Sequence, residues 1–89
     1  MTESKREIAE YLAGMYNSGA LFLDGFDDAI IGFGGQFTNP KLVVYSYQKI
    51  VKALMAQGMD AEGAAEYFSF NIEGAWMGRN TPLIVQEIE

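Results

Sequence analysis

The second half of the chain constrains the fold most, because it holds four regular segments with few residues between them. A short apolar run is followed by two amphipathic helical patterns, and a second apolar run closes the unit. We expect these segments over Leu42–Tyr45, Tyr47–Gln57, Ala61–Met77 and Leu83–Ile88. The pattern predicts a strand–helix–helix–strand unit, in which a helix hairpin is inserted before the last strand.

Start and stop signals support these boundaries. Ser46 and Asp60 stand where a helix N-cap is expected, and Gly58 and Gly78 stand where a left-handed residue ends a helix. Thr81-Pro82 opens the final strand. Because the chain reverses twice through the helix pair, we expect the last strand to run antiparallel to Leu42–Tyr45.

The first half adds a helix and two shorter strand candidates. Ser4 followed by Glu7 has the spacing of a capping box, and the helical pattern after it continues to about Tyr16. The apolar runs Leu21–Leu23 and Ala29–Phe33 flank an Asp-Gly turn. The whole chain, residues 1 to 89, is therefore expected to form a single α+β domain. It should hold a small, mostly antiparallel sheet of three to four strands and about three helices.

Composition excludes several classes of function. The chain has no Cys and no His, which removes thiolate nucleophiles, the commonest general base and the commonest zinc ligand. Six basic against twelve acidic residues give a formal charge of -6, which argues against direct nucleic-acid binding. No apolar run approaches the length of a membrane span. We expect a cytoplasmic, non-enzymatic protein without a cofactor.

Two local patterns invite a ligand interpretation but are explained by turn chemistry. Asp24, Asp27 and Asp28 supply oxygen ligands, yet their spacing matches no EF-hand loop, and Asp24-Gly25 is a turn dipeptide. The glycine-rich stretch that ends in Gly34-Gly35 lacks both a Walker pattern and a following capped helix. We therefore expect no metal site and no phosphate-binding loop.

The last helical pattern has three faces rather than two. The expected core stripe consists of Ala64, Ala65, Phe68, Ile72, Ala75 and Trp76. A second strip consists of Gly63, Tyr67, Phe70 and Gly74, and the opposite arc carries Glu62, Glu66 and Glu73. The second strip either packs against the chain itself or forms an interface, for which aromatic anchors and small residues are suited. The glutamates are either a solvated face or the charged rim of that interface.

Arg79-Asn80-Thr81 follows the expected helix C-terminus, where a cation is electrostatically favoured. A stabilising role is the simplest interpretation. In a symmetric oligomer, however, copies of Arg79 could converge into a pocket for an anion.

The chain from Asp24 onward resembles a group of small proteins encoded by phages and prophages. The resemblance rests on FNIEGAWMG, residues 70 to 78, followed by Thr81-Pro82, and on the earlier segment DGFDDAIIGFG. It covers about three quarters of the chain and implies a phage-type origin. It carries no catalytic or ligand-binding residue across to this sequence.

These observations predict a non-enzymatic, acidic interaction protein of phage type that binds and inhibits a host protein, such as a component of antiviral defence. Its partner-binding residues would be Tyr67 and Phe70 as anchors, with Glu62, Glu66 and Glu73 as the charged rim. The alternative is a homo-oligomer, a dimer or larger, that sequesters a small anionic ligand such as a signalling nucleotide. Arg79, Asn80 and Thr81 would then line the ligand site.

Overall fold

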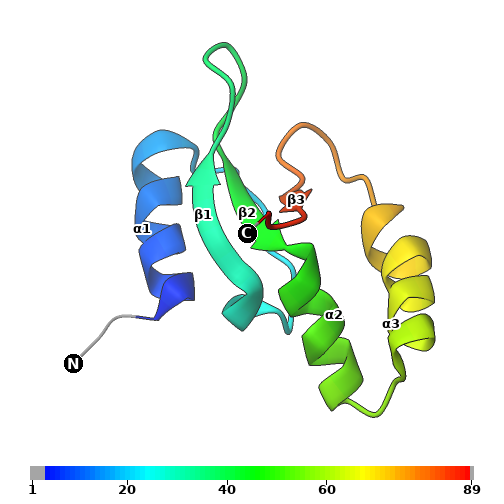
Figure 1. Cartoon of the computed structure of the whole chain (residues 1–89). Helices are drawn as coiled ribbons and strands as arrows, with labels where there is room; N and C mark the ends of the chain where they lie inside the picture. The colour runs from blue at the N-terminus through cyan, green and yellow to red at the C-terminus, as the bar shows by residue number, and fades with distance from the viewer. Residues whose placement is uncertain (1–3, 89) are drawn as a thin grey trace.

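A computed structural model describes residues 4 to 88 and confirms the α+β class (Figure 1). It contains three α-helices and a sheet of three strands, as the sequence predicts. The elements are α1 (Lys5–Tyr16), the short 3-10 helix η1 (Asp27–Ala29), β1 (Ile30–Gly34), β2 (Leu42–Ser46), α2 (Tyr47–Ala56), α3 (Ala61–Phe68), the π-helical turn η2 (Ser69–Glu73) and β3 (Leu83–Val85).

The helices begin at the residues whose side chains can cap them. The Ser4 hydroxyl accepts from the backbone N–H of Glu7 at 3.1 Å, and the Glu7 carboxylate accepts from the Ser4 N–H at 3.3 Å, which completes the capping box. Ser46 accepts from the N–H of Lys49 at 3.2 Å in α2. Gly58 takes a φ of 108° between α2 and α3, a conformation that favours glycine.

The sheet is mixed, which corrects the expected direction of the last strand. Its order is β1-β2-β3, with β1 antiparallel to β2 and β3 parallel to β2, so that Val44 lies opposite Leu83. The α2–α3 hairpin leads away from the end of β2 and back, and the segment from 74 to 82 then carries the chain to the far end of the sheet. Because β3 starts from that end, it runs in the same direction as β2. The expected antiparallel direction was wrong because it did not take this connection into account.

The predicted strand at Leu21–Leu23 is absent, and the segment is irregular. Its backbone groups are satisfied individually rather than by a ladder: the Leu21 N–H donates to the Asn80 carbonyl at 3.2 Å, and the Leu23 N–H donates to the Tyr45 hydroxyl at 2.8 Å. The segment therefore contributes no strand to the sheet.

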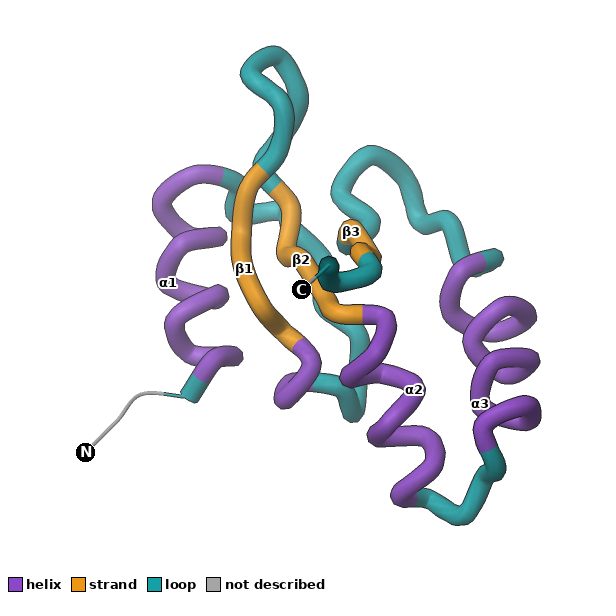
Figure 2. Tube along the Cα trace, in the orientation of Figure 1, coloured by secondary structure: helices purple, strands orange, loops and turns teal. Residues whose placement is uncertain are grey.

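One core joins the sheet to all three helices. Val43 and Tyr45 project from the same face of β2 and are fully buried. They share the core with Ala9, Ala29, Ile30, Ile50, Leu54, Ala64 and Phe68. Figure 2 shows the strands lying between α1 and the α2–α3 pair. This arrangement leaves the outer face of α1 and the C-terminal end of α3 at the surface.

Candidate functional site

The C-terminal part of the last helical segment exposes its aromatic side chains. Phe70 is 82% exposed and Tyr67 is 42% exposed, whereas Phe68 between them is 3% exposed. The Phe68 ring meets the Tyr47 ring edge to face at a centroid distance of 4.8 Å. Phe68 thus fills the core, whereas Phe70 is mostly uncovered and Tyr67 is partly covered by the described chain.

A change of helix type ends the last helix earlier than the sequence pattern predicts. The chain switches from α- to π-helical hydrogen bonding over Ser69–Glu73, and the helix stops there instead of continuing to Met77. A continuous α-helix would place Trp76 one turn after Ile72, on the core stripe. Because the helix stops early, Trp76 is 73% exposed, so the expected core position of Trp76 is wrong. Short π-helical turns are frequent at functional sites.

Four large apolar side chains are exposed within eleven consecutive positions. We call this the exposed aromatic segment; it runs from Tyr67 to Met77 and presents Tyr67, Phe70, Trp76 and Met77. Single exposed apolar residues are ordinary on a protein surface, but several large ones close together make a candidate interaction site. Helix α1 exposes a second such group, Ile8, Tyr11, Met15 and Tyr16.

One of the two glycines of the strip has an explanation within the chain. A Cβ atom on Gly63 would lie 3.0 Å from the Asp60 carboxylate oxygen that caps α3 by accepting from the Gly63 N–H at 2.7 Å. Gly74 has an ordinary helical conformation, and a Cβ atom there would make only ordinary contacts. Close approach of a partner is therefore not needed to account for Gly63, and the interface argument rests on the aromatic residues.

The predicted charged rim is accessible. Glu62, Glu66 and Glu73 are all exposed. Among residues 4 to 88 the ion pairs are those of Arg6 with Glu10 and with Asp27, so none of the three glutamates is neutralised by a neighbouring cation. Their charges are available to a partner.

Two of the three residues in Arg79-Asn80-Thr81 have side chains that hold the loop together. The Asn80 side-chain oxygen accepts from the Asn17 amide at 2.9 Å. The Thr81 hydroxyl accepts from the Met77 N–H at 2.8 Å and donates to the Gly78 carbonyl at 2.7 Å. Arg79 is exposed. A pocket for an anion would thus depend on Arg79, because the neighbouring polar side chains already hold the loop together.

Asp27, one of the three aspartates near the first turn, has a partner. The Asp27 carboxylate accepts from the Arg6 guanidinium at 3.0 Å, and the ring of Phe22 lies 4.1 Å from the same guanidinium carbon. In the part of the chain that the structure describes, no three acidic side chains converge as metal ligands would. The same part contains no helix that is both long and apolar enough to cross a membrane.

Sequence reasoning missed one further feature, a groove between α1 and β1 with Lys5 and Lys49 at one end. No local pattern announces it, since its residues come from three separate elements. Only the amphipathic pattern of α1 could have suggested that this helix lies beside an apolar surface.

Comparison of the chain with protein-family models, with curated proteins and with solved structures found no match. A function must therefore be argued from the surface itself.

Proposed function

We propose that this protein is a non-enzymatic, acidic interaction protein of phage type, which binds a host protein through the exposed aromatic segment and inhibits it. A component of antiviral defence is the class of target that suits the phage-like resemblance. The observation that carries the proposal is the 82% exposure of Phe70 beside a fully packed Phe68.

An aromatic residue in this position is well suited to anchor a complex. Interface hot spots are enriched in large aromatic side chains that enter a pocket on the partner. Full burial of a phenylalanine side chain contributes about 1.5–3 kcal/mol from the hydrophobic effect. Phe70 and Trp76 have that contribution still available, since most of their surface is in solvent.

The charge of the surface favours a basic partner. The chain carries a formal charge of -6, and Glu62, Glu66 and Glu73 add unpaired negative charge to the same helical segment. Such a rim accelerates association with a positively charged surface more than it strengthens the final complex. The association rate should therefore fall as salt is added.

The alternative, a homo-oligomeric binder of a small anion, has less support. It would rely on Arg79, because Asn80 and Thr81 are engaged within the loop. If it were correct, a nucleotide would raise the melting temperature of the wild-type protein and not of Arg79→Ala.

Affinity capture with matched variants tests the leading proposal. The tagged wild-type chain, Phe70→Ala and Phe37→Ala would be incubated with host lysate, and captured proteins would be quantified by mass spectrometry. Phe37 is the control because it is also a solvent-exposed phenylalanine, 97% exposed, but lies in the β1–β2 connection. We expect one host protein at near-equal amount with the wild type and with Phe37→Ala, and its loss with Phe70→Ala.

Charge reversal separates the two parts of the proposed surface. Replacing all three rim glutamates by lysine should slow association with the captured protein and reverse its salt dependence. Unchanged association rates in this triple variant would remove the electrostatic part of the proposal and leave the aromatic anchor.

A further inference from the structure

A second surface, remote in sequence from the exposed aromatic segment, forms a concave apolar groove. It lies between α1 and the edge strand β1 and has a volume of about 350 Å³, which is within the range of small-molecule sites. Most of its wall is aliphatic or aromatic. The lining residues are Lys5, Ile8, Ala9, Leu12, Ile30, Ile31, Gly32, Phe33 and Lys49.

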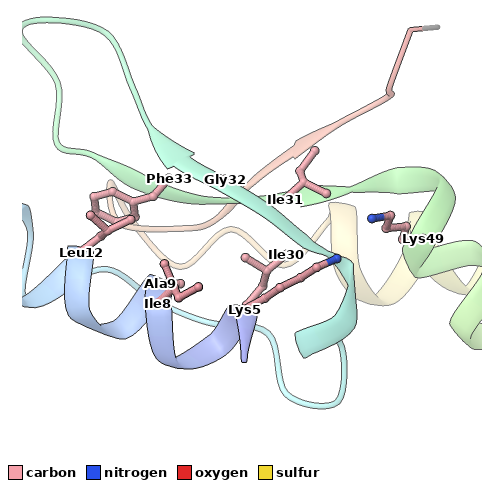
Figure 3. Close-up of a pocket in the computed structure, with 9 residues that line it drawn as sticks. All are labelled: Lys5, Ile8, Ala9, Leu12, Ile30, Ile31, Gly32, Phe33 and Lys49. Atoms are coloured by element: carbon pink, nitrogen blue, oxygen red, sulfur yellow. The ribbon is translucent and has the colours of Figure 1, made fainter. Parts of the chain in front are cut away.

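The two ends of the groove differ in character. Figure 3 shows Leu12 and Phe33 at one end and the amines of Lys5 and Lys49 toward the other. The Lys5 amine donates to the Asp28 carbonyl at 3.3 Å, which holds it near the start of β1. The apolar groove therefore ends at a pair of cations.

The two ammonium groups repel each other. Contact with Lys49 is the main cause that lowers the pKa of Lys5 from its ordinary value, and loss of solvation acts in the same direction. The negative charges of Asp28 and Glu87 offset part of this effect. An anion placed between the amines would relieve their repulsion.

Gly32 lines the middle of the groove with its backbone. A glycine inside a strand weakens it and often marks a place where another molecule approaches the backbone. A Cβ atom at Gly32 would meet only the Cβ of Val44, at 4.0 Å, which is ordinary contact, so the fold itself does not require glycine there. Because Gly32 lies opposite Val44, that Cβ would point to the face of the sheet away from α1.

Two other hollows on the described surface lack this combination. One is lined by Asp27 and Asp28 as well as by Lys49 and Lys52, so its charges are mixed. Another lies between α3 and β3 and includes Glu73 but no cation. Apolar walls with two cations at one end are found in the α1–β1 groove.

We propose that the α1–β1 groove binds an amphipathic monoanion with a linear aliphatic chain, of the class of medium-chain fatty carboxylates. The carboxylate lies between the amines of Lys5 and Lys49, and the chain runs over Gly32 toward Leu12 and Phe33. This proposal is independent of the host-protein interaction, since it uses α1, β1 and the start of α2.

Calorimetric titration with two amphiphiles of equal chain length tests the proposal. Sodium decanoate and decyltrimethylammonium bromide would each be titrated below their micelle concentrations. The net charge of -6 favours non-specific uptake of the cation, so stronger binding of decanoate would have to come from the groove. We expect saturable binding of one decanoate per chain and weaker binding of the cation. Equal binding of the two amphiphiles, or no saturable binding of decanoate, would overturn the proposal.

Two pairs of variants locate the site. The double variant Lys5→Gln/Lys49→Gln should weaken decanoate binding about tenfold or more, because it removes charge-assisted hydrogen bonds, whereas Lys52→Gln should leave it unchanged. Ile8→Glu places a carboxylate in the apolar wall and should abolish decanoate binding, whereas Tyr11→Glu adds the same charge to an exposed position of α1 that does not line the groove.

Circular dichroism would establish that each variant is folded before titration. Binding that survives both Ile8→Glu and the double lysine variant would place decanoate elsewhere and refute the assignment. Equal loss of binding in Ile8→Glu and Tyr11→Glu would show an effect of charge on α1 rather than on the groove, which would equally refute it.

Discussion

Two phenylalanines that stand two residues apart should have separate roles, one in folding and one in binding. Phe68 is buried in the core at 3% exposure, and Phe70 is 82% exposed. Replacing each by alanine removes the same atoms from the same short segment. Phe68→Ala should destabilise the fold, and Phe70→Ala should leave stability unchanged while it abolishes partner binding.

The magnitude for Phe68 depends on its surroundings. Truncating a buried phenylalanine to alanine costs about 3–5 kcal/mol, because transfer free energy is lost and a cavity remains. The edge-to-face contact with Tyr47 at 4.8 Å adds an interaction of about 0.5–1.5 kcal/mol to this loss. Since small domains are stable by roughly 5–15 kcal/mol, Phe68→Ala should lose a large share of the total.

The value for Phe70 is expected to be near zero. Substitutions of exposed residues usually change stability by less than about 0.5 kcal/mol. Within residues 4 to 88, Phe70 belongs neither to the core cluster nor to an aromatic pair. A stability loss above that range would mean that Phe70 packs against the domain in solution.

Urea unfolding followed by far-ultraviolet circular dichroism measures both variants on one scale. The slope of the transition should be the same in both proteins if each unfolds in two states. Similar losses for Phe68→Ala and Phe70→Ala would refute the reasoning, because the two side chains would then have equivalent structural roles.

Three further outcomes are expected from the packing. Burial raises the pKa of Tyr45, so its contribution to stability is complete below the ordinary tyrosine value of about 10 and is lost as pH rises above it. As pH rises above 10, the melting temperature of Tyr45→Phe should therefore fall less than that of the wild type. At neutral pH this variant should be about 1–3 kcal/mol less stable than the wild type, because the Leu23 N–H loses its acceptor. Ser46→Ala should cost about 0.5–2 kcal/mol in urea unfolding, because it removes the cap on α2. Trp76 fluorescence should resemble that of indole in water and be readily quenched by acrylamide, and host-protein binding should shift its emission to shorter wavelength.

Much of the fold was predictable because its signals are local. Ser4, Ser46 and Asp60 each cap the helix that the sequence assigns to them, and their effect depends on residues only three positions away. Gly58 takes the expected left-handed conformation for the same reason. The direction of β3 depends instead on the end of the sheet at which the segment from 74 to 82 enters it. No local sequence pattern specifies that end.

The errors arise from features that residue spacing along the chain does not specify. Leu21–Leu23 has the composition of a strand, but a tyrosine hydroxyl and a loop carbonyl satisfy its N–H groups. Trp76 lies on the apolar stripe of an ideal helix, yet the π-helical turn ends the helix before it is reached. The approach of Lys5 to Lys49 joins the first and second helices, so it could not be inferred from spacing along the chain.

Two residues of the candidate site were predictable, but Trp76 and Met77 were not. The helical pattern identified Tyr67 and Phe70 as a strip apart from the core stripe, and the structure leaves Phe70 mostly uncovered. Gly63, which also suggested an interface, has a simpler origin in the Asp60 cap.

Site-specific photocrosslinking tests the central claim most directly. A photoreactive phenylalanine analogue would be placed at position 70 or, as a control, at position 37, and the protein would be irradiated in host cells. We predict a crosslink from position 70 to one host protein and none to that protein from position 37. Crosslinks to the same protein from both positions, or from position 37 alone, would contradict the assignment of the exposed aromatic segment as the binding surface.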